Sequence, residues 1–276
     1  MTDQEAALAQ WEAQMIVIGI SRRRLERALP RAYKAGLARW ASTGAVTIPV
    51  DAQLALAAVL AKTWRAAVKI GATFPGDTDA DKAALPRLEI KAGEMTLFEQ
   101  IMLDFISRFG AAQVAQILET TRQQLQALVD GGVRDGLGQE AIAKRITDAI
   151  PSLARTRARV IARTETHNAA MHASQEVAKA APFPMNKRWV SVYDARTRDF
   201  GEGDGKADAF NHRIMNEVTV GPDELFSVPR SARYGGGFEL MAGPGDPNGS
   251  AANLIGCRCA LIYRRVGRPW PKTADA

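Results

Sequence analysis

The chain contains few of the residues and runs that mark several protein classes. Only two of its 276 residues are cysteines, Cys257 and Cys259, which excludes a scaffold built on several disulfides. We expect both thiols to be free in a reducing compartment. No apolar run approaches the roughly 20 residues of a membrane-spanning helix, so we expect no membrane partner. The acidic amino terminus lacks the basic start of a secretory signal.

Sequence signatures of catalysis are also missing. The sequence holds no glycine-rich phosphate loop, no G-x-S-x-G nucleophile elbow and no H-E-x-x-H zinc helix. Glu165 and Asp194 could act as an acid/base pair, but two carboxylates in a chain do not establish one. We therefore predict no catalytic residue and a protein that is not an enzyme. The net charge of +6 favours acidic partners such as nucleic acid.

Composition divides the chain near residues 181–184. Alanine, which favours helix, is concentrated before this point, whereas glycine and proline, which break helices, are concentrated after it. We predict an α+β fold. Its helical N-terminal two-thirds are followed by a small, loop-rich, mostly antiparallel sheet that packs on a long helix.

The spacing of apolar residues predicts the individual elements. Helices are expected at 4–18, 22–41, 51–71, 96–130 and 139–149, with a last helix from Pro151 to about Lys179. Strands are expected at 188–193, 217–220, 225–228 and 261–263. Turns or loops are expected at 74–81, 201–205, 235–237 and 242–249. Because proline is best tolerated in the first turn of a helix, we expect Pro30 to break or begin a helix and Pro151 to begin one.

Arginines recur at a spacing of four in the helix after Pro151. Arg155, Arg159 and Arg163 would share one helical face. Such a face can be solvated and ion-paired within the helix, or it can follow the phosphates of a nucleic acid. No helix-turn-helix, zinc-finger or aromatic stacking signature accompanies it, so base-specific reading is not indicated. Arg155 and Arg159 are the predicted nucleic-acid contacts.

Dense polar residues follow on the same helix and after the first strand. Arg163 could meet Asp194, and Glu165 could meet Arg196 or Arg198, in the two-pronged geometry that arginine forms with carboxylates. The alternative is that these polar side chains simply face solvent. The predicted structural network consists of Arg163, Glu165, Trp189, Asp194, Arg196 and Arg198.

The two cysteines are separated by one residue near the end of the chain. In a strand, Cys257 and Cys259 would face the same side and could bind one metal ion. Structural zinc takes four ligands, and the available histidines are His167, His172 and His212. The predicted ligands are Cys257, Cys259 and His212, completed by water or a fourth side chain. Two small buried residues in a terminal strand are the alternative.

Several short blocks occur in a characteristic order. They are 161–166 (Ile-Ala-Arg-Thr-Glu-Thr), Arg188-Trp189, 194–198 (Asp-Ala-Arg-Thr-Arg), His212, 244–247 (Pro-Gly-Asp-Pro) and 257–259 (Cys-Arg-Cys). In this combination the chain resembles the phage Mu F-like head morphogenesis family, the minor head proteins of tailed phages. The resemblance covers roughly residues 120–264. It leaves a variable helical region at 1–119 and a tail at 265–276.

The resemblance implies a structural role in the head. The expected protein acts in head morphogenesis near the portal, with the portal protein and other head proteins as partners. Genomic DNA, bound without sequence specificity during packaging or delivery, is a further expected partner. The expected location is the host cytoplasm during assembly, then the interior of the virion head or the portal vertex. Two alternatives remain open. One is an enzyme of nucleotide or nucleic-acid chemistry, ADP-ribosyltransferase-like or nuclease-like, and the other is a zinc-stabilised binding module. We expect no cofactor other than a structural zinc ion at the predicted ligands.

Overall fold

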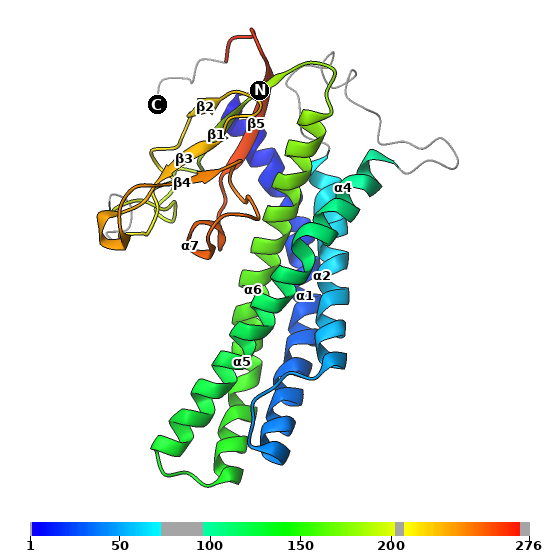
Figure 1. Cartoon of the computed structure of the whole chain (residues 1–276), viewed down its shortest axis with the longest axis vertical. Helices are drawn as coiled ribbons and strands as arrows, with labels where there is room; N and C mark the ends of the chain where they lie inside the picture. The colour runs from blue at the N-terminus through cyan, green and yellow to red at the C-terminus, as the bar shows by residue number, and fades with distance from the viewer. Residues whose placement is uncertain (1, 73–95, 202–206, 271–276) are drawn as a thin grey trace. The chain divides into compact units, whose positions relative to one another are not determined.

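A computed structural model describes residues 2–72, 96–201 and 207–270 (Figure 1). The turn predicted at 74–81 and most of the loop predicted at 201–205 lie outside these residues. The chain forms two compact units, and several helices contribute to both. One, the sheet unit, comprises Met1–Ile16, Trp64–Phe105 and Thr166–Ala276, and the other, the helical unit, comprises Val17–Thr63 and Ile106–Glu165.

The helical unit is built from parts of four helices. These are α1 (Asp3–Thr43), α2 (Val50–Gly71), α5 (Ala111–Arg134) and α6 (Gln139–Lys179). Their apolar faces form a core that includes Leu25, Leu29, Leu56, Leu60, Leu125 and Ile146. Two polar contacts are built into this packing. The Tyr33 hydroxyl donates to Gln124 Oε1 at 2.5 Å, and the Arg157 guanidinium donates to the Ile117 carbonyl at 3.1 Å.

Two prolines lie inside helices, which corrects the sequence prediction. Helix α1 continues through Pro30, and α6 is one helix through Pro151 rather than two. A proline in a helix interior costs about 3 kcal/mol. Burial of a large apolar side chain contributes about 1.5–3 kcal/mol, and buried residues flank both prolines, such as Leu29 before Pro30 and Ile150 before Pro151. Packing on both sides therefore holds each helix together where the local sequence favours a break.

The helix predicted at 96–130 is also more complex than its pattern. It consists of α4 (Leu97–Phe105), a π-helical turn (Ile106–Gly110) and α5. Thr96 and Glu99 cap its start reciprocally: the Glu99 amide donates to Thr96 Oγ1 at 3.1 Å, and the Thr96 amide donates to Glu99 Oε2 at 3.0 Å. Within the described residues, 97–134 is the one helical run long and apolar enough to cross a membrane. Core helices of soluble proteins pass the same test, so the expected absence of a membrane partner stays a prediction.

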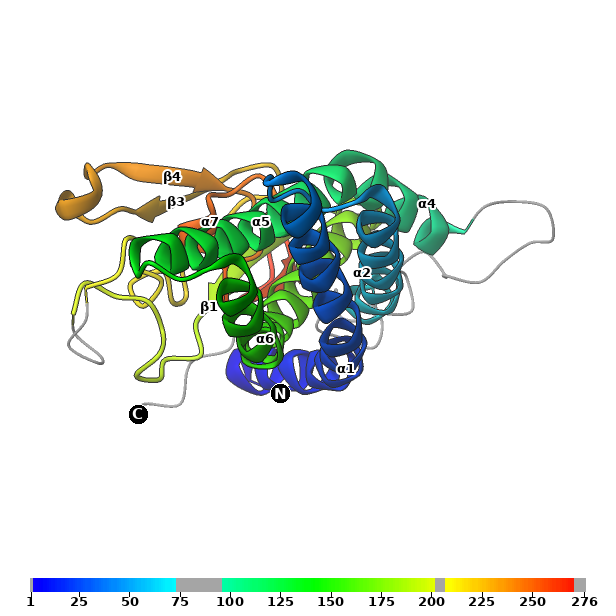
Figure 2. The ribbon, with the colours of Figure 1, turned by 90° about the horizontal axis from the view of Figure 1, so that it is seen from below.

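The sheet unit carries all the described strands. β1 (Met185–Val190) lies between β2 (Thr219–Val220) and β5 (Ala260–Arg265), and both pairings are antiparallel. β3 (Phe226–Pro229) and β4 (Phe238–Met241) form a separate antiparallel pair (Figure 2). A short 3-10 helix (Ala232–Tyr234) connects β3 to β4, and α7 (Ala251–Leu254) precedes β5. Helices followed by small antiparallel sheets confirm the predicted α+β class.

The strands pack on the C-terminal half of α6. Ala178 of α6 belongs to the same buried cluster as Trp189, Phe226 and Leu261, and the hydroxyls of Ser174 and Tyr263 lie 3.5 Å apart. The strand predicted at 188–193 begins earlier and ends at Val190. Tyr193 has a φ of 61°, a left-handed conformation that no regular strand accommodates. The strand β4 was not predicted.

Candidate metal centre

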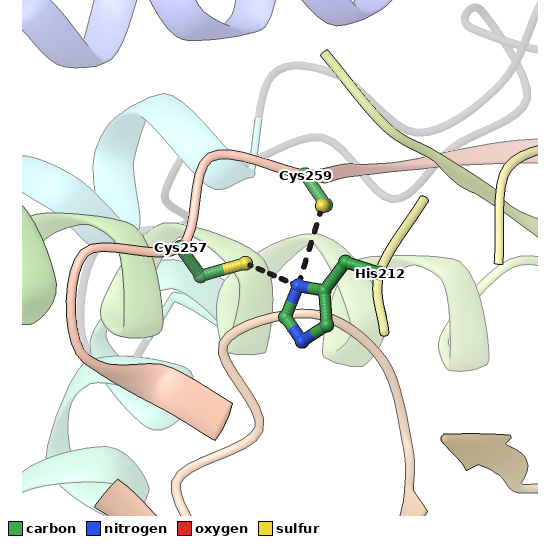
Figure 3. A group of neighbouring side chains, drawn as sticks. All are labelled: His212, Cys257 and Cys259. Carbon is green, nitrogen blue, oxygen red and sulfur yellow. Dashed lines mark hydrogen bonds between the residues drawn. The ribbon is translucent and has the colours of Figure 1, made fainter. Parts of the chain in front are cut away.

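The three predicted ligands meet in the interior of the sheet unit. Cys257 and Cys259 lie between α7 and β5, and His212 lies in the turns between β1 and β2. Each sulfur is 3.6 Å from His212 Nδ1 (Figure 3). The three ligand atoms lie within 4.8 Å of one another, and the exposed fractions of His212, Cys257 and Cys259 are 1%, 2% and 3%. Both cysteines are free. The trio is therefore assembled as expected, and the ion itself stays a prediction.

The other side of the His212 ring is fixed by its neighbours. Its Nε2 contacts Asn253 Oδ1, and the ring meets Trp189 edge-on with centroids 5.2 Å apart. The His212 carbonyl accepts a 2.6 Å hydrogen bond from the Ser191 hydroxyl. An Nε2–H that donates to Asn253 leaves the lone pair of Nδ1 directed at the sulfurs. Metal-binding histidines are commonly held in this way.

The two buried thiols differ in pKa. The hydrogen bond from Cys259 holds the pKa of Cys257 well below its usual range, although burial opposes this, and the neighbouring His212 lowers it further. The same hydrogen bond, together with burial, raises the pKa of Cys259. Cys257 is therefore the readier of the two to become a thiolate, the form that binds metals and attacks electrophiles.

An arginine that the sequence patterns did not single out anchors the segment between the two cysteines. Arg258 makes a two-pronged ion pair with Asp194, with Nη1 2.6 Å from Oδ2 and Nη2 bonded to Oδ1. The Arg196 amide donates to Asp194 Oδ1 at 2.9 Å. These donors, Arg258 first, hold the pKa of Asp194 well below its ordinary range. The alternation of side chains between Cys257 and Cys259 was the available signal, because it turns Arg258 away from the sulfurs.

The remaining members of the predicted network lie in several places. Trp189 is buried against His212, and Arg198 donates to the Ile255 carbonyl. The Arg196 guanidinium lies 3.5 Å from Asp194 but is 72% exposed. Arg163 and Glu165 belong to the helical unit, where Glu165 is buried. Their pairing with residues after β1 stays a prediction.

The predicted nucleic-acid contacts are available to solvent. Arg155 and Arg159 are both exposed on α6. Arg157, between them in sequence, is half-buried and bonded to the Ile117 carbonyl. Arg157 therefore takes part in the packing of the helices, whereas Arg155 and Arg159 face solvent.

His167 is a further polar residue beside the trio. Its Nδ1 lies 3.2 Å from Gln14 Oε1, whereas its Nε2 is buried without a hydrogen-bond partner. An interaction with His167 also contributes to the lowered pKa of Cys257. The predicted loop at 242–249 covers this histidine. A Cβ added to Gly245 would lie 3.0 Å from His167 Cδ2.

The arrangement supports two kinds of chemistry. Two sulfurs and an imidazole nitrogen match the ligands that structural zinc prefers. Alternatively, Cys257, His212 and Asn253 follow the order of a thiol nucleophile, its base and a group that orients the base. A small pocket lined by Val192, Thr197, Arg198 and Gly256 reaches His212 and both cysteines.

Comparison with known proteins identifies the family. The sequence profile described as "Phage Mu protein F like protein" matches residues 123–262, about half of the chain, and the match includes the ligand trio and the Arg258–Asp194 ion pair. No curated protein and no solved structure matches the chain. The match agrees with the resemblance carried by the ordered blocks of the sequence. The chain belongs to the phage Mu F-like family, a family of minor head proteins.

Proposed function

We propose that this protein is a minor component of the phage head that acts near the portal during assembly and works without catalytic turnover. The observation that carries the proposal is the family match over residues 123–262. The motif residues inside the match support a structural role because they bond within the fold. Asp194 holds Arg258, and Asp246 accepts the amides of Ala242 and Asn248 at 2.8 and 3.0 Å.

An exposed apolar surface on the sheet unit supports contact with another head protein. Phe238 and Leu240 of β4 are 67% and 62% exposed, and Tyr234, just before β4, is 49% exposed. Large apolar side chains that gather on one hairpin commonly mark a protein–protein contact. We assign this hairpin surface, defined by Tyr234, Phe238 and Leu240, to the portal or an adjoining head protein.

Composition of purified heads tests the proposal. We expect the protein at low copy number in heads and in their precursors, in complexes that contain the portal protein. The double variant Phe238→Ser/Leu240→Ser should fold and fail to enter heads. A matched control, Val50→Ser/Leu54→Ser, removes equally exposed apolar side chains (68% and 65%) from α2 and should enter normally. A wild-type protein absent from heads and precursors would contradict the proposal.

Contact with the genome is the second part of the proposal. Arg155 and Arg159 are exposed on α6, and each phosphate contact contributes about 0.9 to the slope of log affinity against log salt. Neutralising both arginines with glutamine should therefore lower that slope by about 1.8 and weaken binding equally on all sequences. Arg122→Gln is the control, because Arg122 already pairs with Glu119 at 2.7 Å. Affinity that does not change with salt would exclude this contact.

An enzyme of nucleotide or nucleic-acid chemistry is the competing function. The buried carboxylate of Glu165 is the observation that favours it, because buried carboxylates often serve as catalytic acids or bases. The purified protein should turn over neither NAD nor DNA. Turnover that Glu165→Gln abolishes while the fold is retained would replace the structural proposal.

A further inference from the structure

We propose that His167 completes a structural zinc site with His212, Cys257 and Cys259, so that two cysteines and two histidines hold one ion. This inference goes beyond the role in the head and does not depend on it. All four side chains belong to the sheet unit. They come from the C-terminal half of α6, the turns after β1 and the segment before β5.

The first observation is a buried nitrogen without a partner. His167 is 1% exposed, and its Nε2 makes no hydrogen bond. A buried polar atom without a hydrogen-bond partner destabilises the folded state. The side chains of His167 and Cys257 interact, which places this histidine beside the trio. Coordination to a metal would satisfy the nitrogen and use the lone pair that no protein group occupies.

The second observation is that two sulfurs share one nitrogen. Cys257 Sγ and Cys259 Sγ are each 3.6 Å from His212 Nδ1, which has one lone pair and can accept one hydrogen bond. In a tetrahedral site with zinc–sulfur and zinc–nitrogen bonds of about 2.3 and 2.0 Å, each sulfur lies about 3.5 Å from a ligand nitrogen. The observed separations fit this geometry, and a metal engages both sulfurs at once.

The third observation is that a side-chain amide orients each imidazole ring through the ring nitrogen that would not bind the metal. Each directs its other nitrogen at a side-chain amide oxygen: His167 Nδ1 at Gln14 Oε1, 3.2 Å away, and His212 Nε2 at Asn253 Oδ1. Hydrogen bonds of this kind fix the tautomer and aim the free nitrogen at the ion. The pattern predicts Nε2 of His167 and Nδ1 of His212 as the ligand atoms.

Charge and access favour zinc over a catalytic thiol. Two thiolates neutralise the charge of Zn²⁺, whereas a buried thiolate alone would be costly. A nucleophile must meet its substrate, but the small pocket that reaches Cys257 leaves only 2% of this residue exposed, and Cys257 shares its histidine with a second cysteine. A site closed by four protein ligands is structural, because a catalytic zinc keeps one position open.

The loop at 242–249 determines how much room the His167 ring has to move towards the ion. The group whose ligand atoms lie within 4.8 Å of one another comprises His212, Cys257 and Cys259, so the His167 ring must move towards it on loading. Gly245 leaves room beside this ring, because a Cβ there would lie 3.0 Å from His167 Cδ2. Bound zinc would then tie α6 to the two segments that flank the small sheet, which stabilises the folded state by the free energy of binding.

Metal content and cobalt substitution test the assignment. The full chain, purified from zinc-supplemented medium, should contain one zinc ion per molecule. Replacement of zinc by Co²⁺ should give the visible bands of a tetrahedral site and a thiolate-to-cobalt charge-transfer band. X-ray absorption at the zinc edge of the wild-type protein should report two sulfur and two nitrogen ligands. This measurement needs no variant and remains decisive where a substitution prevents folding.

Variants separate the fourth ligand from its neighbours. His167→Ala should lower zinc affinity at least 100-fold and change the cobalt spectrum, and Gln14→Leu should lower affinity about 10-fold. His172→Ala is the matched control, because His172 is a buried histidine of the same helix that packs on Phe105, with ring centroids 5.3 Å apart. The His172→Ala protein should still contain one zinc ion per molecule. Three outcomes would each overturn the proposal: a zinc-free protein with two alkylatable thiols, a Cys257–Cys259 disulfide, or an unchanged cobalt spectrum in His167→Ala.

Discussion

The variant Gly245→Ala tests how tightly the loop at 242–249 is held against α6. Gly245 has a φ of +73°, and an added Cβ would lie 3.0 Å from His167 Cδ2 and 3.3 Å from Asn168 Cα. The left-handed conformation costs a non-glycine residue about 1–2 kcal/mol. Overpacking of a well-filled interior adds about 1–3 kcal/mol. We therefore expect the free energy of unfolding to fall by about 2–5 kcal/mol.

A second glycine isolates the packing contribution. Gly267, also in the sheet unit, has a φ of +87° with nothing within 4 Å of an added Cβ. Gly267→Ala should cost only the conformational 1–2 kcal/mol. The difference between the two variants, about 1–3 kcal/mol, measures the resistance that the loop meets at His167.

Urea unfolding in the presence of a chelator provides the assay. The chelator keeps metal binding out of the free energies, and calorimetry of the same samples shows whether the two units unfold in one transition. Equal losses in Gly245→Ala and Gly267→Ala would refute the reasoning, because the added methyl group at 245 would then meet no resistance. The loop would not be held on His167 in the way that the structure describes.

Two further substitutions test single features of the fold. Asp194→Ala should cost about 2 kcal/mol at pH 7, because it leaves Arg258, only 10% exposed, without its carboxylate, while the 36% exposure of Asp194 screens the pair. Since the folded-state pKa of Asp194 is depressed, this contribution is present above the unfolded pKa of about 4 and fades as the pH falls towards the folded value. The free energies of unfolding of the wild type and the variant should therefore converge between pH 7 and pH 3. A constant difference would contradict the ion pair. Pro151→Ala should raise the free energy of unfolding by about 1–3 kcal/mol, because it restores an amide to the interior of α6, and a lower melting temperature by calorimetry would show that proline is required there.

Patterns within short stretches of sequence predicted much of the fold. The change from alanine-rich to glycine- and proline-rich sequence placed the boundary near 181–184, and α6 ends at Lys179 while β1 begins at Met185. The spacing of Cys257 and Cys259 predicted that both face one side, and both contact His212. These features depend on periodicity and on residue type, which a sequence displays directly.

Features that depend on distant packing could not be predicted in the same way. The helices continue through Pro30 and Pro151 because buried neighbours on both sides hold them. β4 was missed because its four residues lie between glycine-rich segments and gain their regular backbone from pairing with β3. The role of Arg258 could not be predicted because its partner, Asp194, lies 64 positions away. The sequence shows His167 only as one of three histidines, since its unpartnered nitrogen exists only in the folded chain.

Because the sheets are small, hydrogen bonds and ion pairs of polar side chains fix many of the connections in the sheet unit. Sheets of three and two strands bury too little apolar surface to fix long connections by themselves. The connections are instead fixed by side chains that bond to the backbone, as Asp246 does to Ala242 and Asn248, and by the ion pair of Asp194 with Arg258. A zinc ion at the cysteine pair would extend the same principle. It would cross-link segments that the hydrophobic core alone leaves weakly held.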